Sequence, residues 1–291
     1  MSKYKYIYCN NDIFTVDNTI DDDIITDITK FPIASISKFI TVILILKLKI
    51  NTDLTIGDYI KSPSIFIKNP QLKKTKIIDI IKHEAHIKSV FPFILPDVTT
   101  DFWLSDFMED YLKKHKVFIK IKSLEYYYST IGYIILGYLI EQITGESYFT
   151  NLKRIILDPF KMTHTTISNY DIKLYTNNFI KINDTLMKKL LIFGSSGGGL
   201  CSCVDDLKKF CENIGTLLSK SDIEFLYDNT IWFCKVHNNR GTCHSISNVL
   251  SVNGNFIGAK INISIDFDTN RYVINFKTCH TMPNLKSMLR K

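Results

Sequence analysis

The pattern of apolar and polar positions changes twice along the chain and divides it into three regions. Short β-branched and aromatic runs stand near the start, at residues 4–8 (YKYIY) and 13–16 (IFTV), and predict a hairpin. The same texture returns after residue 230 in WFCKV, SNVLSV, GAKINISID and NRYVINF, with turn-forming NNRG, NG and DFDTN between them. Apolar residues with helical spacing fill the region between the two ends.

The middle region predicts a series of helices. They cover about residues 35–49, 76–87, 101–114, 129–145, 149–157 and 203–214, and a last helix is expected in the tail PNLKSMLRK. The simplest packing is one antiparallel sheet built from both termini with a helical lobe inserted between them, an α+β architecture. We expect a single domain over residues 1–291, with a sheet lobe at about 1–34 and 230–291 and a helical lobe at about 50–215.

The most apolar stretch is FPIASISKFITVILILKLKI, residues 31–50. Its uninterrupted apolar part, 39–46, is far shorter than the ~20 residues that cross a bilayer, and lysines stand on both sides of it. A helix that is apolar all round is typical of one packed inside a large domain. The stretch therefore predicts a buried central helix and not a transmembrane segment.

Composition narrows the class of protein. The chain is 45% hydrophobic and 22% charged, which is ordinary for a globular protein. Seven scattered cysteines show no disulfide or zinc spacing and indicate a reducing compartment. The net charge of +7 comes almost wholly from dispersed Lys, with only four Arg, so we expect a solvated basic surface and no nucleic-acid partner. The N-terminus shows neither a signal peptide nor a mitochondrial presequence, so an intracellular, cytoplasmic location is expected.

The first candidate for chemistry is the SxxK pattern at Ser35 and Lys38. These residues lie at i and i+3 of the predicted helix, on one face and within contact distance. Free backbone N–H groups at a helix start favour negative charge, and a desolvated amine can accept a proton, so Ser35 could act as a nucleophile. The alternative from spacing alone is a plain N-cap serine, because SxxK occurs often by chance.

Four ordered blocks strengthen the nucleophile interpretation. FPIASISKFIT, IIDIIKHEAHI, YYYSTIGYIILGYLIEQITGESY and SGGGLCSCVDDLKKF together resemble the serine β-lactamase-related family, which includes class C β-lactamases, D-Ala-D-Ala carboxypeptidases and related esterases. YST, IASISK and the triple glycine are most similar to the mitochondrial serine β-lactamase-like proteins of animals. The resemblance covers about residues 28–214 well and the C-terminal strands more weakly. It implies the β-lactamase/transpeptidase-like fold, here without the family's N-terminal helix, since only 34 residues precede Ser35.

The resemblance also implies roles for individual residues. Ser35 takes the position of the acylated nucleophile, Lys38 that of its base or proton relay, and Tyr128 that of the phenol that carries a proton to the leaving group. Thr130 stands where most of the family has an Asn that contacts the substrate amide.

The third family motif is degenerate. The best match places Val252 where the family has His or Lys, followed by Gly254 and Asn255. The oxyanion hole would use the backbone N–H groups of Ser35 and Asn255, which do not depend on the side chain at position 252. The resemblance therefore implies a site that is weakened or re-specialised. His244 is a minor alternative for the missing group, and Lys277-Thr278-Cys279, which resembles a KTG triplet, is interpreted as the end of the last strand.

Three further patterns that resemble catalytic or metal-binding motifs have simpler structural explanations. GSSGGG at 194–199 matches GxSxG and would make Ser196 a nucleophile, but the βα alternation of that hydrolase fold is missing, so we expect a flexible turn lining the cleft. His83 and His86 have the wrong spacing for a metal pair and no evident third ligand. Cys201, Cys203 and Cys211 lack a matching His group and are expected to be buried thiols. No metal or other cofactor is expected.

The leading hypothesis from the sequence is a serine hydrolase that forms an acyl-enzyme with a small peptide, amide or ester substrate, with activity attenuated by Val252. The alternative is a catalytically inactive relative that binds partners or self-associates through a sheet surface left open by the short N-terminal part. A GxSxG hydrolase using Ser196 is the third hypothesis.

Overall fold

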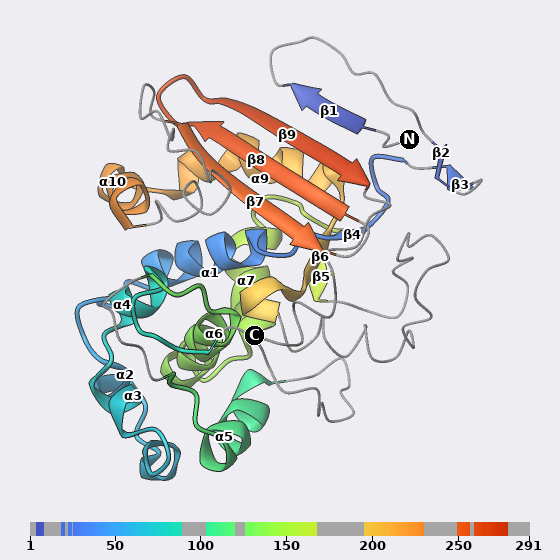
Figure 1. Cartoon of the computed structure of the whole chain (residues 1–291). Helices are drawn as coiled ribbons and strands as arrows, with labels where there is room; N and C mark the ends of the chain where they lie inside the picture. Colours follow the sequence, from blue (N-terminus) through green and yellow to red (C-terminus); the bar gives the residue numbers. More distant parts are fainter. Residues whose placement is uncertain are drawn as a thin grey trace.

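The computed structural model (Figure 1) describes most of the central region and the main sheet. The described residues are 4–8, 19–20, 23–24, 26–88, 103–119, 126–167, 195–229, 249–256 and 259–278. The predicted strands at 13–16 and 232–236, the tail helix at 283–291, His244 and Cys279 lie outside them.

The main sheet is built from both ends of the chain, as predicted. Its four antiparallel strands are β1 (Tyr4–Tyr8), β9 (Arg271–Thr278), β8 (Ala259–Asp266) and β7 (Val249–Phe256), in that order across the sheet. The turn between β8 and β9 is closed by the Asp266 carboxylate, which accepts hydrogen bonds from the backbone N–H of Asp268 and from the Thr269 hydroxyl. The predicted hairpin partner of β1 is outside the described residues, and β1 pairs with β9.

Most predicted helices are present, with some changed limits. The α-helices are α1 (Ile36–Lys47), α2 (Ile56–Tyr59), α3 (Pro70–Lys74), α4 (Ile77–Ile81), α5 (Leu104–Lys114), α6 (Thr130–Thr144), α7 (Tyr148–Leu152), α9 (Val204–Leu217) and α10 (Lys220–Asn229). Three short helical turns are η1 (Pro63–Phe66), η2 (Lys153–Leu157) and η3 (Ser195–Gly199). The sequence pattern missed η1 and α3, each of which begins with a proline that fits the first turn of a helix, and it also missed α10.

The prediction of one helix over 76–87 is wrong in its second half. α4 ends at Ile81, and His83 follows in the left-handed region with φ 60°. The backbone N–H groups of Glu84 and Ala85 return to the Asp79 carbonyl, a pattern typical of helix C-termini. A histidine occupies the place that usually favours glycine, and its ring packs in the core beneath the 126–133 segment.

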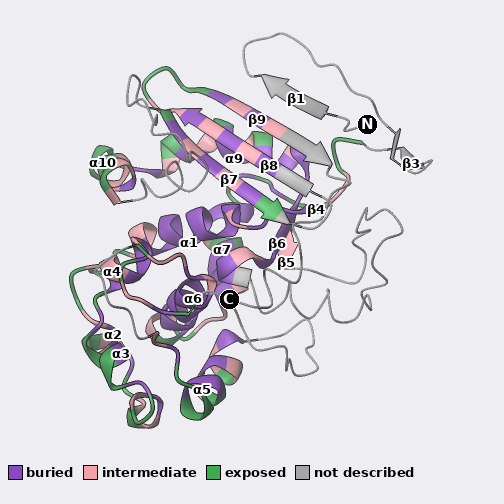
Figure 2. Cartoon of the chain, in the orientation of Figure 1, coloured by how far each residue is buried: buried purple, intermediate pink, exposed green. Residues whose placement is uncertain are grey.

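The central helix α1 lies between the main sheet and the helical lobe (Figure 2), and all its residues from Ile36 to Ile45 are buried. Its sequence is apolar on all sides because both neighbours pack against it. Among the described helices, none has the length and apolarity to cross a membrane. The sequence prediction of a buried central helix is confirmed.

A buried carboxylate organises the helical lobe. Glu141 of α6 is 1% exposed and accepts hydrogen bonds from the backbone N–H groups of Leu104 and Ser105, at the start of α5, and of Tyr148, at the start of α7. Free N–H groups at a helix start favour an anion, so one side chain satisfies two helix ends at once. Burial raises the pKa of Glu141, while these hydrogen bonds oppose that shift.

A second, small sheet leads the chain into α1. β4 (Phe31–Pro32) pairs with β6 (Leu200–Ser202), which also pairs with β5 (Thr166–Ile167). The Ile33 N–H then donates to the Leu200 carbonyl at 2.9 Å. The residues just before Ser35 are thus held by backbone hydrogen bonds to residues more than 160 positions later in the sequence.

The two faces of the main sheet differ in character. Val252 lies with Leu250 and Gly254 on the face packed toward α1, because side chains alternate along a strand. The opposite face carries a hydrogen-bonded set of polar side chains: Asn262 Nδ2 donates to Ser251 Oγ and to Asn253 Oδ1, each at 2.9 Å. Over the described strands, this second face is therefore largely polar.

One glycine allows β7 to approach the residues just before Ser35. A Cβ at Gly254 would overlap the Ile33 carbonyl oxygen, which is backbone and cannot rotate away. We predict that Gly254→Ala lowers the free energy of unfolding by about 1–3 kcal/mol, measured by urea denaturation. The control is Gly215→Ala on the exposed side of α9, where the added methyl meets nothing nearer than 4.0 Å and should stabilise the helix by up to about 1 kcal/mol. Equal effects of the two changes would contradict this packing.

Candidate active site

Ser35 stands at the one opening in an otherwise buried segment. Residues 31–45 are all buried except Ser35, which is half-buried. Ala34, the residue before it, has φ 50°, a left-handed conformation that is strained for a side chain with a Cβ. The turn at Ala34 ends the approach from β4 and starts α1, with Ser35 as its N-cap residue. Local strain and long-range pairing together present the Ser35 hydroxyl to the outside.

Lys38 lies one turn further into α1 and is only 1% exposed. Its Nζ donates to the Gly197 carbonyl and lies 3.4 Å from Ser35 Oγ. It also lies 4.8 Å from the centre of the Tyr128 ring and 5.8 Å from that of Tyr133, distances at which aromatic faces attract a cation. Among the described residues, no carboxylate lies within 4 Å of Lys38 Nζ. The amine is therefore held by a carbonyl, a hydroxyl and ring faces alone.

Tyr128 completes the set predicted from the sequence. Its hydroxyl lies 2.5 Å from Ser35 Oγ, a short hydrogen bond in which either oxygen can donate. The next residue, Ser129, caps α6 by accepting from the Gly132 N–H at 2.9 Å, which fixes the loop that carries the tyrosine. The structure thus brings Ser35, Lys38 and Tyr128 together from three points in the sequence.

The sequence reasoning missed the role of His83 beside this group. Its ring is tilted by 34° against the Tyr128 ring, with centroids 4.5 Å apart, and its Nδ1 accepts the Ser129 N–H at 3.0 Å. That bond places the proton of a neutral imidazole on Nε2. Burial, and then the charge of Lys38, lower the pKa of His83 well below its usual range. A neutral His83 ring therefore packs against the Tyr128 ring. In the sequence, only the helical pattern of the neighbouring residues indicated where His83 would lie.

The expected glycine turn is present, but it is packed and not a loose lining of the cleft. η3 contributes the Gly197 carbonyl to Lys38 and the Ser196 carbonyl to the Thr41 hydroxyl at 2.7 Å. A Cβ at Gly197 would press on Thr130, and one at Gly137 of α6 would overlap Ser196. Ser196 itself has no exposed surface, so the GxSxG hypothesis fails on access.

The third motif forms the facing wall of the site. β7 is the strand of the main sheet next to α1 (Figure 1), and Val252 on it is fully buried, in an apolar core position. Gly254 lies against Ile33, and Asn255 is exposed near the end of the strand. Thr130 is the first residue of α6 and is half-buried. No side chain that could replace the family's His or Lys is placed on the inner face of β7.

The remaining candidates are placed elsewhere. Lys277 and Thr278 end β9, two strands away from β7, as the sequence predicted. The thiols of Cys201, Cys203 and Cys211 are buried, as predicted, and His164, which the sequence reasoning did not connect with them, lies beside Cys203.

Comparisons with known proteins give a family match over more than half of the chain. A family model described as "Beta-lactamase" matches residues 23–231. Among curated proteins, an N-acetylmuramyl-L-alanine amidase of Bacillus subtilis (strain 168) is 27% identical over 94 residues, which are 32% of this chain and 21% of that protein. The chain therefore spans about a fifth of the length of this relative.

Solved structures share the fold across most of the chain. A D-stereospecific amidohydrolase from Streptomyces sp. is 15% identical, with a TM-score of 0.66 over 95% of this chain and 88% of that one. A D-amino acid amidase from Ochrobactrum anthropi SV3 is 17% identical, with a TM-score of 0.65 over 95% and 85%. A β-lactamase/D-alanine carboxypeptidase from Yersinia pestis is 15% identical, with a TM-score of 0.67 over 95% of this chain and 86% of that one. With the family model covering well over half of its length, the chain belongs to the β-lactamase family and has the β-lactamase/transpeptidase-like α+β fold.

Proposed function

We propose that the protein is a serine hydrolase that forms an acyl-enzyme with an amide or ester substrate. The observation that carries this proposal is the convergence of three groups: Ser35 Oγ lies 2.5 Å from the Tyr128 hydroxyl and 3.4 Å from Lys38 Nζ. A nucleophile within reach of proton acceptors at a helix start is the arrangement that covalent catalysis requires.

The proposed reaction has two halves. The Lys38 amine accepts the Ser35 proton as Oγ bonds to the substrate carbonyl carbon, and the proton passes through the Tyr128 hydroxyl to the leaving amine or alcohol as the scissile bond breaks. Water then adds to the acyl-enzyme, its proton returns through the same groups, and the acid product leaves with Ser35 restored. In each half of the reaction, the proton removed from the attacking hydroxyl or water is delivered to the group that leaves.

The developing oxyanion is assigned to backbone N–H groups. We infer that Ser35 N and Asn255 N donate to it, because the first stands at the start of α1 and the second follows Gly254, where β7 approaches the nucleophile turn. The Val252 side chain can contribute neither charge nor a hydrogen bond to this wall. Loss of one electrostatic group of this kind costs on the order of 10²-fold in rate, so a slow enzyme is expected.

The names of two solved relatives support a choice of substrates to test. Two of the solved relatives are named for D-amino acid amides and D-stereospecific amide hydrolysis, so amides and esters of D-amino acids are the first compounds to test. We infer that Thr130 contacts the substrate amide through its hydroxyl. The more specific resemblance to the mitochondrial serine β-lactamase-like proteins of animals has no support from the relatives named above, which are bacterial.

A second candidate is an inactive relative that binds an amide or peptide without turning it over. The observation that favours it is Val252, which replaces a polar catalytic position with an apolar core residue. Binding without hydrolysis would raise the melting temperature in the presence of D-phenylalanine amide while releasing no ammonia.

The first prediction for the hydrolase concerns covalent labelling. A fluorophosphonate probe should label the wild type, and Ser35→Ala should abolish labelling because the nucleophile is gone. Ser196→Ala is the matched control: it removes another serine hydroxyl, which is fully buried, and should label as wild type. Gel fluorescence and intact mass measure the result. Labelling that survives in Ser35→Ala would contradict the role of Ser35.

A second prediction separates enzyme from binder. Hydrolysis of D-phenylalanine p-nitrophenyl ester should be slow but measurable, and Lys38→Met should lower kcat by at least about 10²-fold, because the proton acceptor is lost while the buried volume is kept. A folded wild-type protein with no turnover of D- or L-amino acid esters and amides would favour the binding candidate.

A third prediction tests His83 as a positioning residue. His83→Asn keeps an acceptor for the Ser129 N–H but removes the ring that supports Tyr128, so kcat should fall by about 10- to 100-fold with little change in KM. Stability gives an independent measurement. The folded pKa of His83 lies below its ordinary value of about 6.5, so only the unfolded chain binds a proton just below that pH.

Wild-type stability should therefore fall as the pH drops from 7.5 to 5, with His83 contributing up to about 1.4 kcal/mol per pH unit, and His83→Asn should lose less over the same range. Urea denaturation at several pH values measures the difference. Equal pH slopes, or an unchanged kcat in a folded variant, would show that His83 has no such role.

A further inference from the structure

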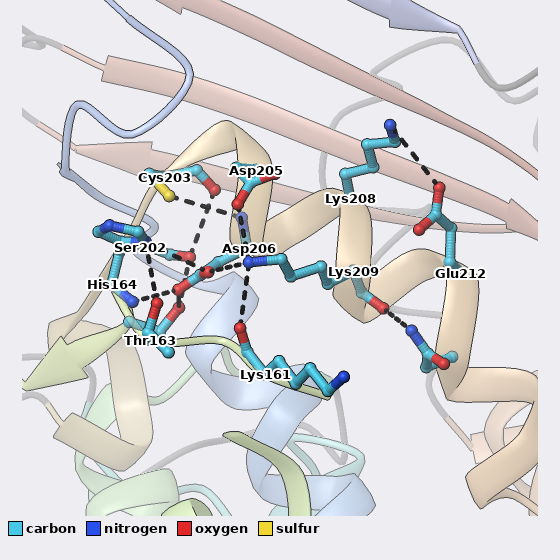
Figure 3. Close-up of polar contacts among 12 residues, drawn as sticks. Lys161, Thr163, His164, Ser202, Cys203, Asp205, Asp206, Lys208, Lys209 and Glu212 are labelled. Atoms are coloured by element: carbon cyan, nitrogen blue, oxygen red, sulfur yellow. Dashed lines mark hydrogen bonds and ion pairs between the residues drawn. The ribbon is translucent and has the colours of Figure 1, made fainter. Parts of the chain in front are cut away.

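A buried group of metal-binding side chains lies outside the active site, where α9 begins (Figure 3). His164, Cys203 and Asp206 each offer a ligand atom, and these atoms all lie within 4.8 Å of one another. Cys203 and Asp206 are 1% and 0% exposed, while the His164 side chain is one-third exposed. Imidazole, thiolate and carboxylate are the three ligand types that zinc takes in proteins.

Only one oxygen of the Asp206 carboxylate accepts hydrogen bonds from the described residues. Its Oδ2 accepts from the His164 N–H and from the Thr165 hydroxyl, both at 2.8 Å. Its Oδ1 is buried and has no hydrogen-bond donor among the described residues; Lys209 Nζ lies 3.5 Å from it and His164 Nδ1 lies 3.7 Å from it. A buried carboxylate oxygen without a hydrogen bond is costly, so this oxygen can gain from a bound cation.

The spacing suits a tetrahedral ion after a small adjustment. Zinc with bonds of about 2.0–2.3 Å holds its ligand atoms roughly 3.3–3.8 Å apart. The separation of 3.7 Å between His164 Nδ1 and Asp206 Oδ1 is already in that range. The other separations reach at most 4.8 Å and can close by small side-chain rotations. The His164 side chain is partly exposed, which leaves room for water as a fourth ligand.

The Cys203 thiol stands at the start of a long helix. Cys203 is the N-cap of the 14-residue helix α9, and its Sγ accepts the Asp206 N–H at 3.5 Å. A helix start favours negative sulfur. Lys209 Nζ forms an ion pair with Asp205 at 2.8 Å and a longer one with Asp206 Oδ1 at 3.5 Å.

We propose that His164, Cys203 and Asp206 bind one zinc ion that fastens the 161–165 turn to the start of α9. Binding converts the Cys203 thiol to a zinc-bound thiolate and releases the thiol proton to solvent. The charge of Zn²⁺ is then balanced by the Cys203 thiolate and the Asp206 carboxylate. The site is structural. β6, which ends at Ser202 immediately before Cys203, pairs with β4 ahead of Ser35, so the ion would stabilise the support of the nucleophile without touching substrate.

The test uses Co²⁺ as a spectroscopic probe and Zn²⁺ as its competitor, on the full chain without a histidine tag. Wild type should bind one Co²⁺ with a thiolate-to-metal absorption in the near ultraviolet, and Zn²⁺ should displace it, release one proton and raise Tm. Cys203→Thr keeps an N-cap side chain, so it should fold, but it should lose the thiolate band and bind Zn²⁺ at least about 100-fold more weakly.

Two controls keep the outcome decisive. Cys201→Ala removes a buried thiol of the neighbouring strand and should leave the spectrum and affinity unchanged, whereas His164→Gln should weaken binding like Cys203→Thr. Fluorophosphonate labelling of Ser35 should persist in Cys203→Thr. The proposal is overturned if wild type shows no thiolate band, if the band survives in Cys203→Thr, or if Cys201→Ala abolishes it.

Discussion

The arrangement of this protein depends on placing one amine, Lys38 Nζ, inside an apolar core. A side chain of this kind at 1% exposure loses nearly all contact with water, and a buried ammonium is costly unless protein groups replace its solvent. Here the replacements are the Gly197 carbonyl, the Ser35 hydroxyl and the faces of Tyr128 and Tyr133. These groups come from three parts of the chain, so replacing the solvent of one amine determines how several segments pack.

The consequences extend outward from that contact. The Gly197 carbonyl reaches Lys38 only because η3 lies directly on α6, and that approach requires glycine at 197 and 137. The tyrosine that faces Lys38 is held by the cap of α6 and by the neutral ring of His83. On the other side, Gly254 lets β7 touch the turn that presents Ser35. The site is thus assembled by backbone fit as much as by its reactive side chains.

Much of this could be predicted from the sequence, and the limits are instructive. The all-round apolarity of residues 39–46 indicated a central helix, and strand-like runs at both ends indicated a shared sheet, because both signals are local. Ser35, Lys38 and Tyr128 were found because motif order restricts where they can stand. His83 was missed because its role depends on a left-handed turn that ends α4 early, and no glycine marked that turn. His164 was missed because 38 residues separate it from Cys203, and only tertiary packing brings the two together.

The central claim is that Ser35 becomes acylated, and peptide mapping of a trapped intermediate tests it most directly. The protein would be mixed with a D-phenylalanine ester, quenched in acid within the first turnover and digested with trypsin, which yields the peptide Phe31–Lys38. That peptide also contains Ser37, which is fully buried, so fragmentation must locate the added mass. We predict a D-phenylalanyl adduct on Ser35. An adduct on Ser37 or on another peptide, or hydrolysis with no adduct under conditions that trap acyl-enzymes, would contradict the account.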